Sequence, residues 1–362
     1  MTGPRVVVGM SGGVDSSVAA LLLKEEGYDV IGVTMQIWQS ESSAAAERDG
    51  GCCGTLAAAD AARVADVLDI PHYVMDFRPE FEEHVVRYFV DSYIRGRTPN
   101  PCVACNRFVK WEALLDRSLA LGAEYIATGH YAGIVKLENG RFSVRNAVTA
   151  AKDQTYALYQ LTQRQLSHTL MPVGGYTKPE IREIAEKAGL PVASKPDSQE
   201  ICFIPDDDYG GFIDRYAPGR VPGPGSFVDS GGNILGTHRG ITHYTVGQRK
   251  HLGLPMGKPV FVTGIDPEKN EVRIGSGDEV FGTELTCDEV NYMAVGEEAF
   301  RTGEIRARAK IRYTQRDAVP CTLRREGKLL RCVFDVPVRA ITPGQAAVFY
   351  EGDHILCGGT IL

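Results

Sequence analysis

A glycine-rich turn between a strand and a helix, at residues 9–16, is the feature that most constrains this chain. The turn reads Gly-Met-Ser-Gly-Gly-Val-Asp-Ser and follows an apolar run at 5–8 that is typical of a buried parallel strand. Apolar residues at helical spacing follow it, until Gly27 ends the predicted helix. This geometry forms a phosphate site, because free N–H groups and the positive end of the helix dipole face the anion.

The side chains of the turn favour the same interpretation. Gly12 and Gly13 allow close approach of an anion, Ser11 and Ser16 add hydroxyl donors, and Asp15 can hold Mg²⁺ that screens phosphates. The common nucleotide loop ends Gly-Lys-Ser/Thr, but no lysine follows the glycine pair here. This pattern suits an enzyme that releases pyrophosphate from ATP and leaves AMP on its substrate. The alternative is a plain strand-to-helix turn without a ligand.

Length and composition indicate a protein of several domains. A chain of 362 residues is long for a single hydrophobic core, which suggests two or three domains. We find no apolar run that could span a membrane and no signal peptide, so we expect a cytoplasmic protein. Nine cysteines in such a chain favour thiol or metal chemistry over a disulfide framework.

The first 205 residues alternate strands and helices. Strands are predicted at 28–36, 72–77 and 125–130, with helices at 56–68 and 108–121. The fold class is therefore α/β, a doubly wound parallel sheet with helices on both faces. Ligands bind at the carboxyl ends of such strands, where the glycine turn and Thr128-Gly129-His130 would both lie.

The pattern changes after about Pro205. A small β-rich domain is predicted at 206–280, where glycine and proline clusters separate short strands. From 281 to 362, alternation such as that of 305–311 predicts an antiparallel β-barrel with one basic face. The net charge of −7 argues against nucleic-acid binding by the chain as a whole. One patch of the sequence is nevertheless locally basic. The patch comprises Arg301, Arg306, Arg308, Lys310, Arg312 and Arg316.

The cysteines fall into distinct groups. Cys102 and Cys105 lie in segment 95–107, predicted as a proline-stiffened loop whose three arginines would stabilise a thiolate or bind phosphate. Their spacing fits a redox pair, half a zinc site or part of a cluster, and buried inert thiols are the alternative. Cys202 lies in a second predicted loop, whereas Cys52 and Cys53 have no assignment. Buried inert thiols are predicted at Cys287, Cys321, Cys332 and Cys357.

The glycine turn, segment 98–106 and the Cys202 segment together resemble the tRNA-specific 2-thiouridylases. These are PP-loop ATP pyrophosphatases that sulfurate the wobble uridine. Further matching segments are Ala127–Tyr131, Lys152–Gln154, Tyr244–Lys250 and Thr342–Tyr350, so the resemblance covers nearly the whole chain. It implies a PP-loop catalytic domain at 1–205, a tRNA-contacting domain at 206–280 and a tRNA-binding barrel at 281–362.

The resemblance implies a reaction sequence. ATP adenylates the carbonyl oxygen on carbon 2 of uridine, pyrophosphate departs, a sulfur nucleophile attacks carbon 2, and AMP leaves. By resemblance, Cys202 carries the sulfur as a persulfide and Cys105 attacks to release it, leaving a Cys105–Cys202 disulfide. Implied partners are tRNA of the Lys, Glu and Gln types and a cysteine desulfurase or sulfur-relay protein.

The resemblance also assigns binding residues. Those implied for ATP are Gly9, Met10, Ser11, Gly12, Gly13, Val14, Asp15, Ser16, Met35 and Gly129. Those implied for the target base are Asn100, Pro101 and Cys102, and those for the rest of the tRNA are His130, Lys152, Asp153, Gln154, Arg312, Tyr313 and Gln345. This last group has other interpretations. His130 could be an ordinary capping side chain, Lys152 and Asp153 a solvated ion pair, and Arg312 and Tyr313 part of an exposed strand face.

The chain departs from the family pattern at two positions. Cys102 stands where many members have an aspartate cast as a general base, and His251 stands where glycine is usual. Cys102, Cys105 and Cys202 could instead hold a 4Fe–4S cluster whose open iron binds sulfide. Two further alternatives are a PP-loop amidotransferase or ligase acting on a small molecule, and a non-catalytic, nucleotide-regulated RNA-binding protein.

Overall fold

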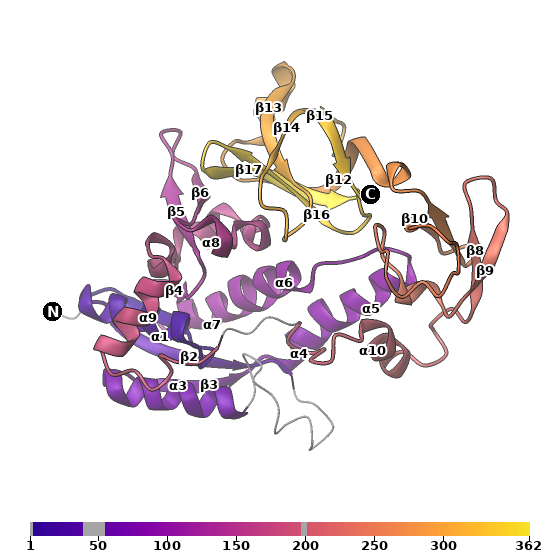
Figure 1. The fold of residues 1–362 in the computed structure, drawn as a ribbon. Coiled ribbons are helices and arrows are strands. Elements are labelled where there is room, and N and C mark those ends of the chain that lie inside the picture. The colour runs from indigo at the N-terminus through magenta and orange to yellow at the C-terminus, as the bar shows by residue number, and fades with distance from the viewer. Residues whose placement is uncertain (1–2, 39–54, 197–200) are drawn as a thin grey trace. The chain divides into compact units, whose positions relative to one another are not determined.

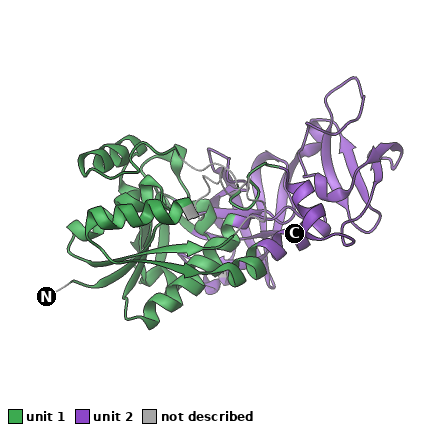
Figure 2. Ribbon diagram, turned by 90° about the horizontal axis from the view of Figure 1, so that it is seen from below, with its two compact units in different colours: residues 1–85, 102–207, 352–355 green, residues 86–101, 208–351, 356–362 purple. Residues whose placement is uncertain are grey.

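The computed structural model, drawn in Figure 1, describes residues 3–38, 55–196 and 201–362. Cys52, Cys53 and the polar segment around 40–51 lie outside these ranges. The chain forms two compact units, which Figure 2 distinguishes by colour. Unit 1 comprises residues 1–85, 102–207 and 352–355, and unit 2 comprises residues 86–101, 208–351 and 356–362.

Unit 1 contains the predicted parallel sheet, in the order β3-β2-β1-β4-β7. Its strands are β1 (Arg5–Gly9), β2 (Asp29–Gln36), β3 (His72–Asp76), β4 (Tyr125–Thr128) and β7 (Thr169–Leu170). All four pairings are parallel. Val6, Val7 and Val8 are almost fully buried because helices cover the sheet, which explains their unbroken apolar run. The α/β prediction is confirmed.

The helices around this sheet follow the predicted apolar faces. They include α1 (Val14–Glu25), α3 (Thr55–Leu68), α8 (Gln163–Ser167) and α9 (Lys178–Lys187). The helix predicted at 56–68 is α3, which buries Ala61, Val64 and Leu68 on one face. The capping box of Thr177 and Glu180 begins α9, because each side chain bonds the other residue's backbone N–H. Unit 1 also contains a hairpin of β5 (Ala132–Lys136) and β6 (Phe142–Asn146).

The segment at 95–107 differs from the prediction of a loop. The helical elements of this region are α4 (Arg78–Phe81), η1 (Glu82–Val86), α5 (Arg87–Ile94), α6 (Pro101–Ala104), η2 (Cys105–Leu114, π-helical) and α7 (Leu115–Ala120). A helix therefore begins at Pro101, seven residues before the predicted start at Phe108. Proline suits a first helical position because its missing N–H would have no partner there. Cys102 and Cys105 thus lie on a helix.

Unit 2 contains a four-stranded sheet in the order β10-β11-β8-β9. The strands are β8 (Gly225–Val228), β9 (Ile234–His238), β10 (Phe261–Asp266) and β11 (Glu271–Gly275), and helix α10 (Tyr209–Tyr216) precedes them. Phe227, Val262 and Val272 are fully buried in its core. Of the predicted glycine and proline clusters, the one at 230–233 lies between β8 and β9, whereas the one at 221–225 leads from α10 into β8.

Unit 2 also holds the predicted antiparallel barrel, in the order β12-β15-β14-β13-β16-β17 and closed by a β12–β17 pairing. Its strands are β12 (Phe281–Tyr292), β13 (Ile305–Lys310), β14 (Val319–Glu326), β15 (Leu329–Arg339), β16 (Ala346–Glu351) and β17 (His354–Ile361). Along β13 the alanines are buried and the arginines exposed, as predicted. None of the helices within the described ranges has the length and apolar content needed to cross a bilayer.

The four barrel cysteines are fully buried, as predicted for inert thiols. Burial raises the pKa of the Cys287 and Cys357 thiols. A hydrogen bond with Cys321, together with burial, raises the pKa of Cys332. Since the thiolate is the reactive form, these residues are poor nucleophiles.

Candidate active site

The glycine turn has the predicted strand–turn–helix geometry. β1 ends at Gly9 and α1 begins at Val14. Gly12 has a φ of +66°, and a Cβ there would lie 2.4 Å from the Ala57 carbonyl oxygen, so only glycine fits. The Ser11 N–H donates to Ser16 Oγ (3.2 Å), which fixes the turn from inside. The turn therefore holds the start of α1, with its first N–H groups, in one arrangement.

The other residues predicted to bind ATP lie at the same edge of the sheet. Gly129 follows β4, and a Cβ there would lie 2.5 Å from the Ser16 nitrogen. Met35 lies near the carboxyl end of β2, which pairs with β1. The structure thus brings together segments 9–16, Met35 and Gly129, and their contact with ATP stays a prediction.

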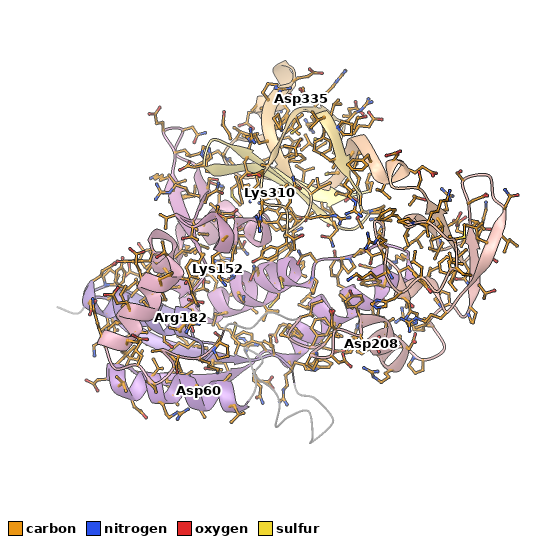
Figure 3. The ribbon with its side chains drawn as sticks, viewed as in Figure 1. Asp60, Lys152, Arg182, Asp208, Lys310 and Asp335 are labelled. Atoms are coloured by element: carbon orange, nitrogen blue, oxygen red, sulfur yellow. The ribbon has the colours of Figure 1, made fainter. Side chains whose placement is uncertain are left out.

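Two lysines, which the sequence analysis missed, lie at this turn. Lys178 Nζ donates to both carboxylate oxygens of Asp15 (2.7 and 2.9 Å). Lys195 Nζ donates to the Gly12 carbonyl (3.0 Å) and to an Asp60 oxygen (2.7 Å; Figure 3 labels Asp60). Burial alone would raise the pKa of Asp60, but hydrogen bonds from Lys195 and Arg63 lower it.

One sequence signal could have indicated Lys178. It is the first residue of α9, where the helix dipole repels a positive charge. A lysine at such a position needs a compensating anion, and Asp15 supplies one. The tertiary fold alone reveals which carboxylate this is, since 163 residues separate the two.

The cysteines of the first pair differ in exposure. Cys105 is buried, whereas Cys102 is exposed. The next residue, Asn106, anchors the helix: its Nδ2 donates to the Ala157 carbonyl (2.9 Å), and its Oδ1 accepts from Lys110 Nζ (2.9 Å). The helix therefore holds the Cys105 backbone in a fixed place within unit 1.

Cys202 is half-buried on a turn of unit 1. The Ile204 N–H closes this turn by donating to the Ile201 carbonyl (2.9 Å). Phe203 and Ile204 are buried, and the Phe203 ring packs 5.7 Å from that of Phe81, measured between centroids. The core thus anchors the residue beside Cys202.

The predicted three-thiol cluster site does not match this geometry. Across the described parts of the chain, no group of three or more His, Cys, Asp or Glu side chains is placed to hold a metal ion. The helix that begins at Pro101 buries Cys105 and exposes Cys102, instead of presenting both on one loop. Cys102, Cys105 and Cys202 therefore do not form a ready ligand set for a 4Fe–4S cluster.

In contrast to the three cysteines, Asp15 has the chemistry of a metal ligand, in this case for Mg²⁺. Mg²⁺ beside a nucleotide takes one or two carboxylates and completes its octahedron with phosphate oxygens and water. Asp15 supplies one carboxylate in the first turn of α1, and the Tyr131 hydroxyl orients it (2.7 Å). This donor set fits Mg²⁺ bound together with ATP.

The residues of unit 1 that were predicted to contact tRNA make internal bonds. His130 shares a hydrogen bond with Thr128 Oγ1 (2.7 Å), and burial, then the Lys110 charge, lowers its pKa well below the usual range. The Asp153 carboxylate accepts from the Ala147 N–H (2.9 Å), and Gln154 Oε1 accepts from the Tyr131 N–H (2.8 Å). These bonds fix the backbone around Lys152, and contact with tRNA stays a prediction.

The basic face of the barrel is partly neutralised. Arg306 donates to the Asp335 carboxylate (2.9 Å), and the two charges lie on one exposed face. Arg312 donates to the Ala340 carbonyl (2.9 Å) and to Thr342 Oγ1 (3.2 Å), which ties it to its own unit. Tyr313 is half-exposed. The prediction of tRNA contacts at Arg312 and Tyr313 stays open.

Gln345 holds the loop that leads to Asn100 and Pro101. Its Nε2 donates to the carbonyls of Thr98 (3.0 Å) and Pro99 (3.3 Å). The Thr98 N–H in turn donates to the Pro343 carbonyl (2.8 Å). The Gln345 side chain positions this loop of unit 2, and the tRNA contact that the resemblance implies for Gln345 stays a prediction.

Replacing Gln345 with alanine is expected to destabilise unit 2. The variant leaves the Thr98 and Pro99 carbonyls without their side-chain donor, which costs about 1–2 kcal/mol of unfolding free energy. Urea denaturation of the full chain measures this, with the exposed Arg316→Ala as control. Equal stability of the two variants would contradict the positioning role.

The fold and the turn together define a nucleotide-binding α/β protein, and family models agree. Residues 4–206 match the model described as a tRNA methyl transferase HUP domain. Residues 210–276 match a tRNA methyl transferase PRC-barrel domain, and 282–361 match an aminomethyltransferase beta-barrel domain.

Full-length relatives identify the family more closely. The chain is 62% identical over 359 residues to a tRNA-specific 2-thiouridylase of Lachnoclostridium phytofermentans, with 99% of each chain covered. It is 53% identical to the enzyme of that name in Clostridium perfringens (100% and 99% covered) and 52% to that of Acetivibrio thermocellus (100% of each). The chain belongs to the tRNA-specific 2-thiouridylase family.

Proposed function

We propose that this protein thiolates carbon 2 of the wobble uridine of tRNA, using ATP and sulfur carried on cysteine. One observation carries the proposal: unit 1 combines a lysine-free glycine turn with anchored cysteine segments at Cys105 and Cys202. Family membership over the whole chain supports it. The methyl transfer named in the family models would leave both the turn and the cysteines without a role.

The glycine turn would bind the triphosphate of ATP. The N–H groups at the start of α1 would face the phosphates, and Ser11 and Ser16 would add hydroxyl donors. Mg²⁺ held at Asp15 would neutralise phosphate charge. The uridine oxygen attacks the α-phosphate and displaces pyrophosphate, which converts a poor leaving group into AMP.

Sulfur transfer would use the two cysteines in turn. Cys202 would carry the outer sulfur as a persulfide, and the Cys105 thiolate would attack the Cys202 sulfur. The sulfur–sulfur bond of the persulfide breaks, a Cys105–Cys202 disulfide forms, and sulfide leaves with the electron pair. Sulfide attacks carbon 2, AMP departs, and an external thiol reduces the disulfide.

Substrate and location follow from the same proposal. We propose tRNAs of the Lys, Glu and Gln types as substrates and a cysteine desulfurase or sulfur-relay protein as donor, in the cytoplasm. Residues 206–280 and 281–362 would bind tRNA, while 1–205 would catalyse. Asn100, Pro101 and Cys102 would face the target base after it leaves its stack.

A single assay tests this proposal against its rivals. Iron-free protein is incubated with tRNA, ATP and a labelled persulfide donor, and thiouridine, AMP and pyrophosphate are counted. We expect one of each per turnover. Activity that appears only after anaerobic cluster reconstitution would replace the disulfide route with cluster chemistry at Cys102, Cys105 and Cys202.

The rivals predict other results. Pyrophosphate release that a small metabolite stimulates and tRNA does not affect would indicate an amidotransferase or ligase. RNA binding without any pyrophosphate release would indicate a non-catalytic RNA-binding protein. Either result would overturn the proposed function.

A further inference from the structure

Cys202 lies in a stretch of unit 1 where side-chain packing, and not a helix or strand, fixes the backbone. Among the described residues, 201–208 form turns and bends alone. The ring of the next residue, Phe203, is 2% exposed and packs against two other rings. Its centroid lies 6.0 Å from that of Trp38 and 5.7 Å from that of Phe81. The place of the Cys202 backbone therefore depends on this aromatic cluster of Trp38, Phe81 and Phe203.

Backbone hydrogen bonds tie the other two rings of the cluster to each other. Trp38 follows the end of β2, and Phe81 ends α4. The Phe77 N–H donates to the Gln36 carbonyl (2.9 Å), and the Phe81 N–H donates to the Phe77 carbonyl (2.9 Å). The Trp38 and Phe81 rings also pack together, with centroids 6.5 Å apart. These contacts join the end of β2 to α4, so the two rings form a fixed support for Phe203.

Trp38 differs from the other two members of the cluster in its burial and its place. Phe81 and Phe203 are almost fully buried and belong to the core, whereas Trp38 is half-buried. Trp38 also lies three residues after Met35, at the edge of the sheet where ATP is predicted to bind. Loss of the Trp38 ring would therefore remove support from Phe203 without opening a cavity in the centre of the core.

We propose that Trp38 is a positioning residue for Cys202: its indole holds the Cys202 turn through Phe203, at one place relative to the edge of the sheet where ATP would bind. This inference rests on the proposed function, since it concerns the sulfur-transfer step. Trp38 acts through Phe203 and takes no part in making or breaking bonds. Loss of its ring would slow sulfur transfer, which needs an oriented thiol, and would spare the adenylation performed at the glycine turn.

The first test measures how often the Cys202 turn opens. The full chain is alkylated with iodoacetamide, and mass spectrometry of the Cys202 peptide follows the rate. In Trp38→Ala we expect this rate to rise about 10-fold, because lost ring packing lets the turn open more often and exposes a half-buried thiol. Trp38→Phe keeps a ring against Phe203 and should stay within about twofold of the unchanged chain.

The second test separates the two chemical steps in a single turnover with tRNA, ATP and a labelled persulfide donor. In Trp38→Ala, thiouridine formation should slow about 10- to 100-fold, because a displaced thiol reacts more slowly. Pyrophosphate release, and the ATP concentration at which it is half-maximal, should stay within about twofold. Trp38→Phe should restore thiouridine formation.

Tyr28→Ala is the matched control for both tests. Tyr28 is also half-buried, and it lies next to the opposite end of β2, where its ring packs 6.3 Å from that of Tyr125 between centroids. Its loss removes an aromatic pair from the same strand, far along the strand from Trp38. The control should alkylate Cys202 and form thiouridine at the rates of the unchanged chain.

Two results would overturn the inference. Equal alkylation rates in Trp38→Ala and Tyr28→Ala would mean that the Cys202 turn is held without the indole. Parallel losses of pyrophosphate release and thiolation would make Trp38 a structural part of the ATP edge. Trp38→Leu, a smaller truncation, gives the same comparisons if the alanine variant does not fold. If the unchanged chain forms no thiouridine, the proposed function fails, and the alkylation rates still decide whether Trp38 holds the Cys202 turn.

Discussion

Replacing either Cys105 or Cys202 with serine is expected to lower 2-thiouridine formation by at least about 10³-fold, while ATP still binds. A serine hydroxyl can neither carry a persulfide nor form a disulfide, so each variant stops sulfur transfer at a different step. The two residues lie in separately anchored segments, next to Asn106 and Phe203. Mass spectrometry of digested tRNA measures the product.

The same chain supplies matched controls for this experiment. Cys332→Ala changes a fully buried barrel thiol and should keep thiolation, at the cost of some stability. Cys287→Ala changes another fully buried barrel thiol and should behave in the same way. Full activity of either serine variant would refute the assignment.

The fold was predictable wherever local pattern and tertiary environment agree. Buried parallel strands need apolar residues on both faces, so the run at Val6–Val8 identified β1 without ambiguity. The alternation of alanine and arginine in 305–310 likewise identified a barrel strand with one exposed face. Both patterns are direct consequences of which side chains the fold buries.

The segment around Cys102 shows where that reasoning fails. Pro99 and Pro101 suggested a stiff loop, but proline at a first helical position also begins helices. The local sequence fits both interpretations, and the burial of Val103 and Cys105 selects the helix. The wrong prediction matters because it placed both thiols on one loop, whereas the helix buries Cys105 and exposes Cys102.

For the candidate site too, the sequence predicted one part and missed another. The glycine turn is one continuous segment, so its geometry follows from the neighbouring residues at 9–16. Lys178 and Lys195 reach it through α9 and the turn that follows, which no local pattern specifies. The motif around Gln345 likewise did not reveal the hydrogen bonds by which this side chain positions a loop of unit 2.

Replacing Gly129 with alanine is expected to disrupt the ATP site from the end of β4, the strand next to β1. The added Cβ would lie 2.5 Å from the Ser16 nitrogen and 2.6 Å from the Asp15 carbonyl carbon. These are backbone atoms in the first turn of α1, so no side-chain rotation relieves the overlap, and the helix start must shift. A misplacement of this kind lowers the rate of pyrophosphate release about 100-fold, and overpacking costs about 1–3 kcal/mol of unfolding free energy.

Gly175→Ala is the matched control, because no heavy atom lies within 4 Å of a Cβ added there. We expect its unfolding free energy to change by less than about 0.5 kcal/mol and its pyrophosphate release to stay unchanged. Pyrophosphate release and urea denaturation, measured side by side, separate the two effects. If Gly129→Ala released pyrophosphate as fast as Gly175→Ala, the close approach of β4 to α1 would not be what holds the N–H groups of the turn in place.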